Sequence, residues 1–426
     1  MGHNNPCGVR VCVSAVSHTI PDRRAERDGV PGSTPLPELL DVLAYARERD
    51  YTGWDYCDGM SSRIRRTLPV ENRWVNLAFQ EAAKRTPVNV RPLLLVERRR
   101  NFMGAGLFAM ANLTVDRVLH ESGTAGTADV DFASEATELL EWLIANRVRG
   151  YSGFCGSHQH QTQSVTGTGD TDTPSVLSTA TPARALLRAG RLDPVYPTVG
   201  RTAGDFVVED LEYREVEDGA VIKYLPTDDW DHVTPNAIAV GARLLLELFT
   251  HTGDVRQAER AGEMLEFVAG LQTVEGGWFY RHPPEASHLS MDNFHNGFVL
   301  EALLRYDELV DGNRFEGVID RALAFHRTTL FDENGAPNWD ESSTYPRDVH
   351  ASAQGIVVFS MTGEFDRAER ILGWALENLS DGEGRFYFRK HRFYTKRVTL
   401  MRWCQAWMAY AMSVLLARRR FEEPPG

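Results

Sequence analysis

The second half of the sequence repeats a pair of amphipathic helices at a nearly constant interval. Apolar spacing predicts helices over 236–250 and 255–271, 296–309 and 315–330, 352–360 and 365–379, and a last one over 403–416. Four apolar residues mark corresponding places in the first helix of each pair, Ile238, Phe298, Ile356 and Trp407, and are separated by 60, 58 and 51 residues. Because one helical hairpin cannot bury its apolar face alone, a repeat of this length predicts a solenoid or a closed toroid.

The first half of the sequence contains further helices with less regular spacing. They are expected over 36–48, 71–85, 104–118, 132–146 and 175–190, whereas the apolar run 90–96 fits either a strand or a helix. Residues 207–225 alternate in polarity around an acidic glycine turn, which predicts a small β-hairpin insertion. We therefore expect a mainly α-helical (α/α)6 toroid of about six hairpins over residues 36–420. The glycine-, proline- and charge-rich segment 1–35 is expected to be weakly ordered, and 157–174 to form a long polar loop.

Composition excludes several classes of protein. The chain has 426 residues and a formal net charge of −13, whereas proteins that bind duplex nucleic acid are usually basic. Its five cysteines are scattered and form no CxxC, which argues against a disulfide scaffold or zinc knuckle and fits a reducing cytoplasm. No apolar run approaches the roughly 20 residues of a membrane span, and the N-terminus is too polar for a signal peptide. A soluble, cytoplasmic protein is the expectation.

Each complete helical pair ends in a glycine-aromatic segment: GGWFY at 276–280, NGAPNW at 334–339 and GEGRFYF at 382–388. In a toroid, such loops converge on one mouth. Trp278, Trp339 and Tyr280 could stack on a sugar ring there, or could pack the ends of the hairpins. Tyr280, Tyr345 or Tyr394 could also donate a proton.

Two carboxylates precede inner helices of successive repeats. Asp292 and Asp348 are 56 residues apart, and a histidine follows each of them, His295 and His350. Unpaired backbone N–H groups at a helix N-terminus favour anionic ligands and ionised carboxylates. Two carboxylates at one mouth suit glycoside hydrolysis, and an aspartate-histidine pair suits general acid-base chemistry. The alternatives are that the aspartates only cap their helices and that the histidines are structural.

Basic and amide side chains accompany these segments. The basic groups expected at the mouth are Arg281, Arg347, Arg389, Lys396 and Arg402, and the amides are Asn236, Asn293 and Gln405. A guanidinium group binds a carboxylate through two hydrogen bonds, so this set favours an anionic sugar, although solvated surface charge is the alternative.

Two other motifs give weak signals. His158 and His160 with Asp170 and Asp172 do not have the spacing of a metal site, so no metal or cofactor is expected. Residues 272–278 fit the QxxxGxW repeat of terpene cyclases, which are also α-toroids, but the motif occurs once and the cyclase acid motif is absent.

The chain resembles the six-hairpin (α/α) toroid glycosidase superfamily. More narrowly, it is similar to archaeal and bacterial proteins encoded with glycan-assembly genes, some of them implicated in processing a hexuronic acid during archaeal N-glycosylation. The matching segments cover roughly 130–420 and include GGWFYRH (276–282), DNFHNGFVLEAL (292–303), YPRDVHASAQGI (345–356) and FYFRKHRFYTKRVTLMRWCQAWM (386–408). The resemblance implies sugar chemistry, but hydrolases, lyases and epimerases all use this fold.

From these observations we expect an enzyme that acts on a hexuronic acid carried on a nucleotide or lipid. The expected reaction is C5 epimerisation, with base and acid drawn from His295, His350 and Tyr280, and with Arg281 and Arg347 on the substrate carboxylate. A hydrolase of uronyl or unsaturated uronyl linkages that uses Asp292 and Asp348 is the second reading. A toroid that only binds glycan is the third. The oligomeric state does not follow from the sequence.

Overall fold

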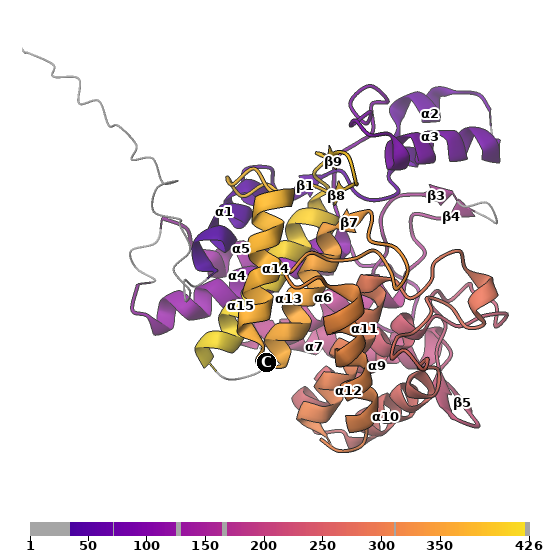
Figure 1. Cartoon of the computed structure of the whole chain (residues 1–426), viewed down its shortest axis with the longest axis vertical. Helices are drawn as coiled ribbons and strands as arrows, with labels where there is room; N and C mark the ends of the chain where they lie inside the picture. The colour runs from indigo at the N-terminus through magenta and orange to yellow at the C-terminus, as the bar shows by residue number, and fades with distance from the viewer. Residues whose placement is uncertain (1–34, 71, 125–128, 164–167, 311, 422–426) are drawn as a thin grey trace, which may run out of the picture. The chain divides into compact units, whose positions relative to one another are not determined.

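The structure, a computed structural model, describes residues 35–70, 72–124, 129–163, 168–310 and 312–421 (Figure 1). Pro35–Gly426 form one compact unit. Apart from Pro35, the N-terminal segment that we expect to be weakly ordered lies outside the described residues.

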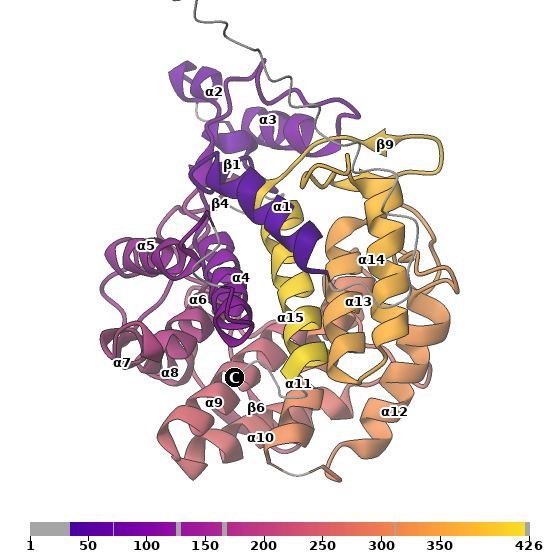
Figure 2. The ribbon, with the colours of Figure 1, turned by 90° about the vertical axis from the view of Figure 1, so that its left-hand side faces the viewer.

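Six helices form a closed inner ring (Figure 2). Each packs against the next one in the chain, and the last packs against the first. These helices are α4 (Phe102–Glu121), α6 (Val176–Arg188), α9 (Pro235–Thr252), α11 (Asn293–Leu309), α13 (Val349–Met361) and α15 (Trp407–Phe421). A π-helical turn, η7 (Met401–Ala406), leads into α15. Each inner helix has packed helices on both sides. Most of its positions are therefore buried, and its faces differ little in solvent exposure.

An outer helix covers each inner one. The outer elements are α1 (Leu36–Arg47), α5 (Phe132–Ala145), α7 (Val195–Arg201) with α8 (Ala203–Asp205), α10 (Val255–Gly270), α12 (Glu316–Phe325) and α14 (Phe365–Leu379). They pack on α15, α4, α6, α9, α11 and α13 respectively. Short 3-10 or π-helical turns, η3 (Ala189–Arg191), η4 (Phe206–Asp210) and η6 (His326–Leu330), continue α6, α8 and α12. The alternation of inner and outer helices confirms the predicted (α/α)6 toroid.

Short antiparallel strands occur in the connections. They pair as β1 (Thr52–Gly53) with β2 (Arg99–Arg100), β3 (Thr162–Gln163) with β4 (Thr168–Gly169), β5 (Arg214–Val216) with β6 (Gly219–Val221), and β7 (Arg347–Asp348) with β8 (Arg389–Lys390) and β9 (Thr395–Lys396). The connection from β1 to β2 carries η1 (Gly59–Ser61), α2 (Arg63–Thr67) and α3 (Arg73–Arg85), and η5 (Pro284–Ala286) precedes α11. The predicted hairpin over 207–225 is therefore shorter, because 206–210 form a π-helical turn. The run 90–96 forms turns, and the polar loop contains the β3–β4 pair.

Polar caps fix where inner helices begin. The side chains of Asn101 and Ser175 accept the N–H groups of Gly104 and Ser178, which starts α4 and α6. Asp292 and Asp348 cap α11 and α13, which begin at Asn293 and Val349. Because an outer helix returns the chain between successive inner helices, the N-termini of the inner helices lie at the same end of the ring. We call this end the mouth.

One described helix, α4, is long and apolar enough to cross a membrane by length and composition. It is also a member of the inner ring, and 72% of its most apolar window is buried inside the protein. A core helix of a folded domain has these same properties.

Candidate functional site

The aspartate-histidine pair at the start of α11 is formed. Oδ2 of Asp292 lies 2.7 Å from Nδ1 of His295, and Oδ1 accepts the backbone N–H of His295 at 3.2 Å. The carboxylate is buried, whereas the imidazole is partly exposed. Asp292 therefore both caps the helix and orients the histidine.

An aromatic cluster surrounds His350 at the start of α13. Its ring stacks between Phe294 and Trp407, with centroid distances of 4.7 Å and 4.5 Å, and Trp403 meets it edge-on at 4.7 Å. Both ring nitrogens are buried and have no hydrogen-bond partner within the described part of the chain. Burial, followed by the charges of Arg402, His295 and Arg389, holds the pKa of His350 well below its ordinary value. His350 is therefore a neutral imidazole in an apolar setting.

The two histidines belong to the same group of side chains. The ring of Phe294 lies 4.1 Å from that of His295 and contacts His350 on α13. The Tyr280 ring lies 4.4 Å from that of His295, on the chain segment that leads toward α11. Burial raises the pKa of Tyr280 to about 12, so its phenol keeps its proton at neutral pH. The four side chains come from two adjacent inner helices and one loop.

Asp348 is fully engaged by protein groups. Its Oδ1 accepts the N–H of His350 at 2.8 Å and the indole N–H of Trp403 at 2.9 Å, and its Oδ2 accepts Nε–H of Arg389 at 2.5 Å. Strand pairing places Arg389 opposite Asp348, which explains the ion pair. The carboxylate is buried and ties the β7–β8–β9 sheet to α13.

The basic side chains expected at the mouth have different partners. Arg402 pairs with Asp55 at 2.8 Å, Arg347 pairs with Asp332 at 2.6 Å, and Lys396 donates to the carbonyl of Lys84. Burial, followed by Arg91 and Arg389, lowers the pKa of Lys396 to about 8. Arg281 differs, since it donates a hydrogen bond to the carbonyl of Ala286 and its buried Nε has no acceptor among the described residues.

Arg281 thus makes no ion pair with a carboxylate within the described ranges. Its guanidinium group lies near the Tyr280 ring, at 5.9 Å from the centroid. It is the one arginine of the predicted set for which the described residues provide no carboxylate partner.

Other predicted residues lie in the walls of the mouth. The indole N–H of Trp278 donates to Val268, Asn293 donates to Leu330, and Gln405 bridges Phe386 and Gly384. Trp339 is partly exposed and lies under the guanidinium group of Arg389, and Tyr345 is exposed beside Arg347. The amide of Asn236, at the start of α9, is buried and has no hydrogen-bond partner among the residues that the structure describes.

The structure adds residues that the sequence did not single out for this site. Asp55 and His160 are buried near Arg402, and His158 lies with them. Burial, followed by the charges of Arg402 and His160, lowers the pKa of His158 to about 3. The Tyr56 ring contacts the Trp403 ring at 4.7 Å. These residues come from the β1–β2 connection and the polar loop, where no periodic pattern indicates which way a side chain points.

Tyr224 is a further addition. It lies close enough to Tyr280 and Arg281 for their charges to act on its phenol, whose pKa burial raises above its ordinary value. It follows β6, the second strand of the predicted hairpin. An aromatic residue at the end of a short hairpin carries no motif by which the sequence could have revealed it.

The QxxxGxW segment joins neighbouring elements through hydrogen bonds. The Gln272 amide donates to the carbonyls of Gly276 and Val318, and its oxygen accepts Nε–H of Arg321. Trp278 is anchored to α10 by its indole. These contacts tie α10, the loop and α12 together, which accounts for the motif without cyclase chemistry.

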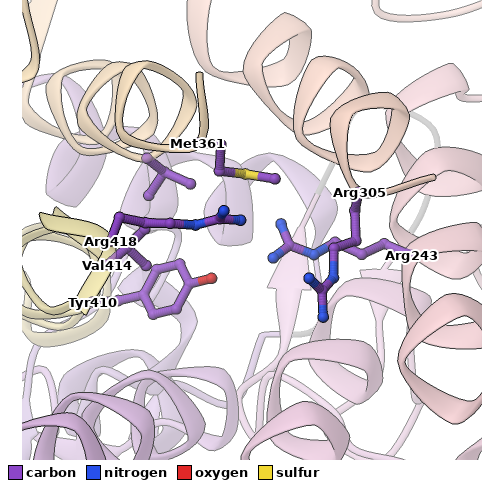
Figure 3. A pocket seen from close by; sticks show the side chains of 7 residues that line it. Arg243, Arg305, Met361, Tyr410, Val414 and Arg418 are labelled. Atoms are coloured by element: carbon purple, nitrogen blue, oxygen red, sulfur yellow. The ribbon is translucent and has the colours of Figure 1, made fainter. Parts of the chain in front are cut away.

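Two further observations concern the surroundings of the site. His158, His160, Asp170 and Asp172 form no cluster able to hold a metal ion, and neither do other His, Cys, Asp or Glu groups of the described chain. A small pocket lies elsewhere, lined by residues of α9, α11, α13 and α15 (Figure 3).

No protein-family model matches the sequence, and no curated protein matches it significantly. Solved structures do match. Cellobiose 2-epimerase from Bacillus thermoamylovorans has a TM-score of 0.58 and 12% identity, over 75% of this chain and 88% of that one. The GH76 α-mannanase of Bacteroides thetaiotaomicron has a TM-score of 0.56 and 13% sequence identity, and the match covers 76% of this chain and 88% of that one. The unsaturated glucuronyl hydrolase of Bacillus sp. GL1 has a TM-score of 0.56 and 12% identity, and the match covers 91% of this chain and 97% of that one. At these identities the likeness shows the fold, and the chain shares the (α/α)6 toroid with these six-hairpin proteins.

Proposed function

We propose that this protein is a carbohydrate-processing enzyme that epimerises a hexuronic acid at C5 by proton transfer. The observation that carries the proposal is the Asp292–His295 pair beside Tyr280, at an aromatic-lined helix mouth. Two of the similar structures point the same way, since one is an epimerase and another acts on an unsaturated glucuronyl sugar. The hexuronic acid would be carried on a nucleotide or a lipid, as an oligosaccharide or a single sugar.

His295 is the proposed base. A carboxylate at Nδ1 favours the tautomer in which Nδ1 carries the proton and Nε2 has a free lone pair. The same carboxylate stabilises the imidazolium that forms when Nε2 takes a proton. The C5–H bond breaks, its proton moves to Nε2, and its electron pair passes into the sugar carboxylate as an enediolate.

Tyr280 is the proposed acid. Its phenol keeps its proton at neutral pH, because burial raises its pKa to about 12. Donation of that proton to the opposite face of C5 gives the epimer and leaves a phenolate, to which the His295 imidazolium returns a proton through solvent. His350 is neutral and buried, and in this proposal it supports the floor of the site.

Arg281 is the proposed partner of the substrate carboxylate. Arg347, Arg389 and Arg402 each pair with a carboxylate, whereas Arg281 donates to the carbonyl of Ala286 and has no carboxylate partner among the described residues. A guanidinium group bound to the carboxylate would offset the charge of the enediolate as it forms.

A hydrolase that uses Asp292 and Asp348 is the second candidate, and the contacts of Asp348 argue against it. Three donors from the protein occupy that carboxylate, so neither of its oxygens is free for water or a sugar. Hydrolysis needs one carboxylic acid that gives up a proton and one carboxylate that reaches water or the sugar.

The test is incubation of the full chain with hexuronic acid glycans in heavy water, followed by proton NMR. We expect loss of the H5 signal through deuterium incorporation, appearance of the C5 epimer and no new reducing ends. The variant His295→Gln should abolish the exchange. His120→Gln is the matched control, because His120 also pairs with an aspartate, Asp116 at 3.4 Å, on an exposed face of α4.

Other outcomes would overturn the proposal. New reducing ends without exchange at C5 would indicate the hydrolase. Saturable sugar binding with neither reaction would indicate a toroid that only binds glycan. Exchange that survives in His295→Gln and is lost in His350→Gln would transfer the role of base to His350.

A further inference from the structure

An arm of the β1–β2 connection extends from the mouth end of the ring. The arm is the segment 62–96, which carries α2 and α3 and is closed at its base by the antiparallel bridge between Ser62 and Val96. Figure 1 and Figure 2 show α2, α3 and β9 at the same end of the molecule. Nζ of Lys396 in β9 donates to the carbonyl of Lys84 in α3. We call the arm and the β8–β9 hairpin, residues 389–397, the rim surface.

The rim surface borders the candidate site. Tyr56 lies just before the arm, and its ring contacts that of Trp403, which in turn meets His350 edge-on. Nζ of Lys84 lies 5.1 Å from the centroid of the Tyr56 ring, so the end of α3 lies above the same aromatic cluster. Whatever the rim surface binds is therefore held close to the catalytic mouth.

The rim surface exposes large apolar side chains. Trp74, Val88 and Leu93 are each more than 60% exposed, and Phe393 at the tip of the hairpin is 88% exposed. The other exposed apolar residues of the arm are Ile64, Leu68, Val70 and Leu95. More than half of the exposed large apolar side chains of the described chain lie on this surface. Such a concentration marks an interaction site.

The rim surface is also basic, in a protein that is otherwise acidic. The arm has seven basic and two acidic residues, and residues 389–397 have five basic residues and no acidic one, whereas the whole chain has a net charge of −13. Arg63 and Arg66 share one carboxylate, that of Glu97, and both side chains stay largely exposed. Charge complementarity therefore favours a negatively charged partner.

The way in which apolar and basic groups alternate favours a lipid surface. Arg73 lies over the ring of Trp74 at 4.8 Å, and Arg392 lies over the ring of Phe393 at 5.4 Å. At a bilayer surface an aromatic ring can enter the apolar layer while the cation beside it stays among the headgroup phosphates. Duplex nucleic acid has no apolar layer for an aliphatic side chain such as that of Leu93.

We propose that the rim surface docks on a bilayer that contains anionic phospholipid, with Trp74, Leu93 and Phe393 at the acyl boundary. Docking there holds the mouth at the membrane, where a lipid carrier would present its sugar. The choice of a lipid carrier over a nucleotide rests on the proposed function. The docking itself does not depend on the reaction.

Sedimentation of the full chain with vesicles, without any sugar, tests the docking. We expect binding to vesicles of equal parts phosphatidylcholine and phosphatidylglycerol, and little binding to phosphatidylcholine alone. Binding should weaken as sodium chloride is added, because salt screens the headgroup charge. Equal binding to both kinds of vesicle, or binding to neither, would overturn the proposal.

Variants show whether the binding belongs to the rim surface. Val88→Ser combined with Leu93→Ser should weaken binding to the anionic vesicles roughly tenfold, because both changes remove apolar surface from the acyl boundary. Arg66→Gln combined with Arg85→Gln should weaken it by roughly fivefold per charge. All four side chains are exposed, so both variants should fold. Unchanged binding in both would overturn the proposal.

The matched control lies at the opposite end of the ring, where α10 begins. Val255 is exposed and Arg256 pairs with Asp254, so Val255→Ser combined with Arg256→Gln makes both kinds of change away from the rim surface. This variant should bind anionic vesicles as the parent does. Self-association of the parent that the rim variants abolish, without vesicle binding, would instead assign the surface to a second copy of the chain and overturn the proposal.

Activity separates this proposal from the proposed function. The rim variants should keep the parent rate of deuterium exchange on a water-soluble hexuronic acid glycan. On the same glycan anchored in anionic vesicles, their rate should fall by the factor by which their vesicle binding falls. Vesicle binding without exchange on either glycan would overturn the proposed reaction and leave the docking standing. Equal rates for the parent and the rim variants on the anchored glycan would overturn the lipid carrier.

Discussion

Nδ1 of His295 lies 2.7 Å from Oδ2 of Asp292, while Oδ1 of the same carboxylate accepts the backbone N–H of His295. One aspartate thus starts an inner helix and sets the orientation of the imidazole three residues later. The two functions can be separated, because asparagine caps a helix as well as aspartate does but cannot stabilise an imidazolium.

The variant Asp292→Asn should therefore lose activity without losing the fold. We expect the rate of deuterium exchange at C5 to fall by roughly 10²–10⁴-fold, the usual contribution of a positioned acid or base. Unfolding in urea should show a change below about 1 kcal/mol, within the range for exchange of good caps. Asp131→Asn, at the start of α5, is the matched control and should leave the exchange rate unchanged.

Replacement of Arg281 by methionine tests whether this arginine binds the carboxylate of the substrate. Loss of a charge-assisted hydrogen bond costs about 1.5–3 kcal/mol, so KM for a hexuronic acid glycan should rise by roughly 10- to 100-fold. Affinity for the matching neutral hexose should stay the same. Arg256→Met on the outer helix α10, where Arg256 pairs with Asp254, is the control. Equal losses for charged and neutral sugars would assign Arg281 a structural role.

Acid should destabilise the fold partly through His326. Burial, followed by the charge of Arg327, lowers its pKa to about 3 from an ordinary 6.5, so the folded state keeps it neutral while the unfolded chain protonates. Stability from this group is complete above pH 6.5 and falls as the pH drops below it, by up to about 1.4 kcal/mol per pH unit.

The variant His326→Phe should flatten this dependence. His326 lies among Phe331 and Phe359, so a phenyl ring suits its surroundings. Between pH 7 and pH 5 the variant should lose about 2 kcal/mol less unfolding free energy than the parent. Urea titrations at the two pH values measure the difference. Equal losses of unfolding free energy in the variant and the parent would contradict the prediction.

Tyr410 should titrate near neutral pH. Its pKa is lowered to about 7 by arginines of α6 and α9, while Glu247 and Glu301 lie in the same buried group. Because the folded pKa is depressed, this group adds stability that is complete above the unfolded value of 10 and is lost as the pH falls through about 7. The tyrosinate absorbance of the native protein should show a step there that is absent from Tyr410→Phe.

A glycine in the QxxxGxW segment should tolerate no side chain. Gly276 has φ of +99°, and a Cβ atom would lie 2.5 Å from the carbonyl of Arg321. Gly276→Ala should cost roughly 2–4 kcal/mol, from the unfavourable backbone region and the clash. Gly253→Ala, at φ of +70° with open space around it, isolates the backbone effect and should cost about 1 kcal/mol. Calorimetry of the two variants gives the comparison.

The sequence predicted those parts of the molecule that follow from local rules. Apolar spacing located the inner and outer helices of 236–379, and the two aspartates marked where α11 and α13 begin. Corresponding positions in successive repeats brought His295 and His350 to the same end of the ring, because each repeat has the same geometry.

The sequence did not predict the contacts made by segments that lack a repeating pattern of apolar residues. Asp55 meets Arg402 across 347 residues of chain, from a connection that has neither a repeat nor a motif. The arginines at 184, 243 and 305 were visible as charges in apolar helices, but their gathering depends on how far each helix is rotated about its axis. Apolar spacing identifies a buried face and does not determine which buried residues meet.

The closed ring has a consequence for the order of folding. Helix α15 packs against both α13 and α4, which lie far apart along the chain. Until α15 docks, α4 and α13 expose apolar flanks to solvent. A chain truncated before residue 401 would keep both flanks exposed, and we expect it to be captured by chaperones or degraded.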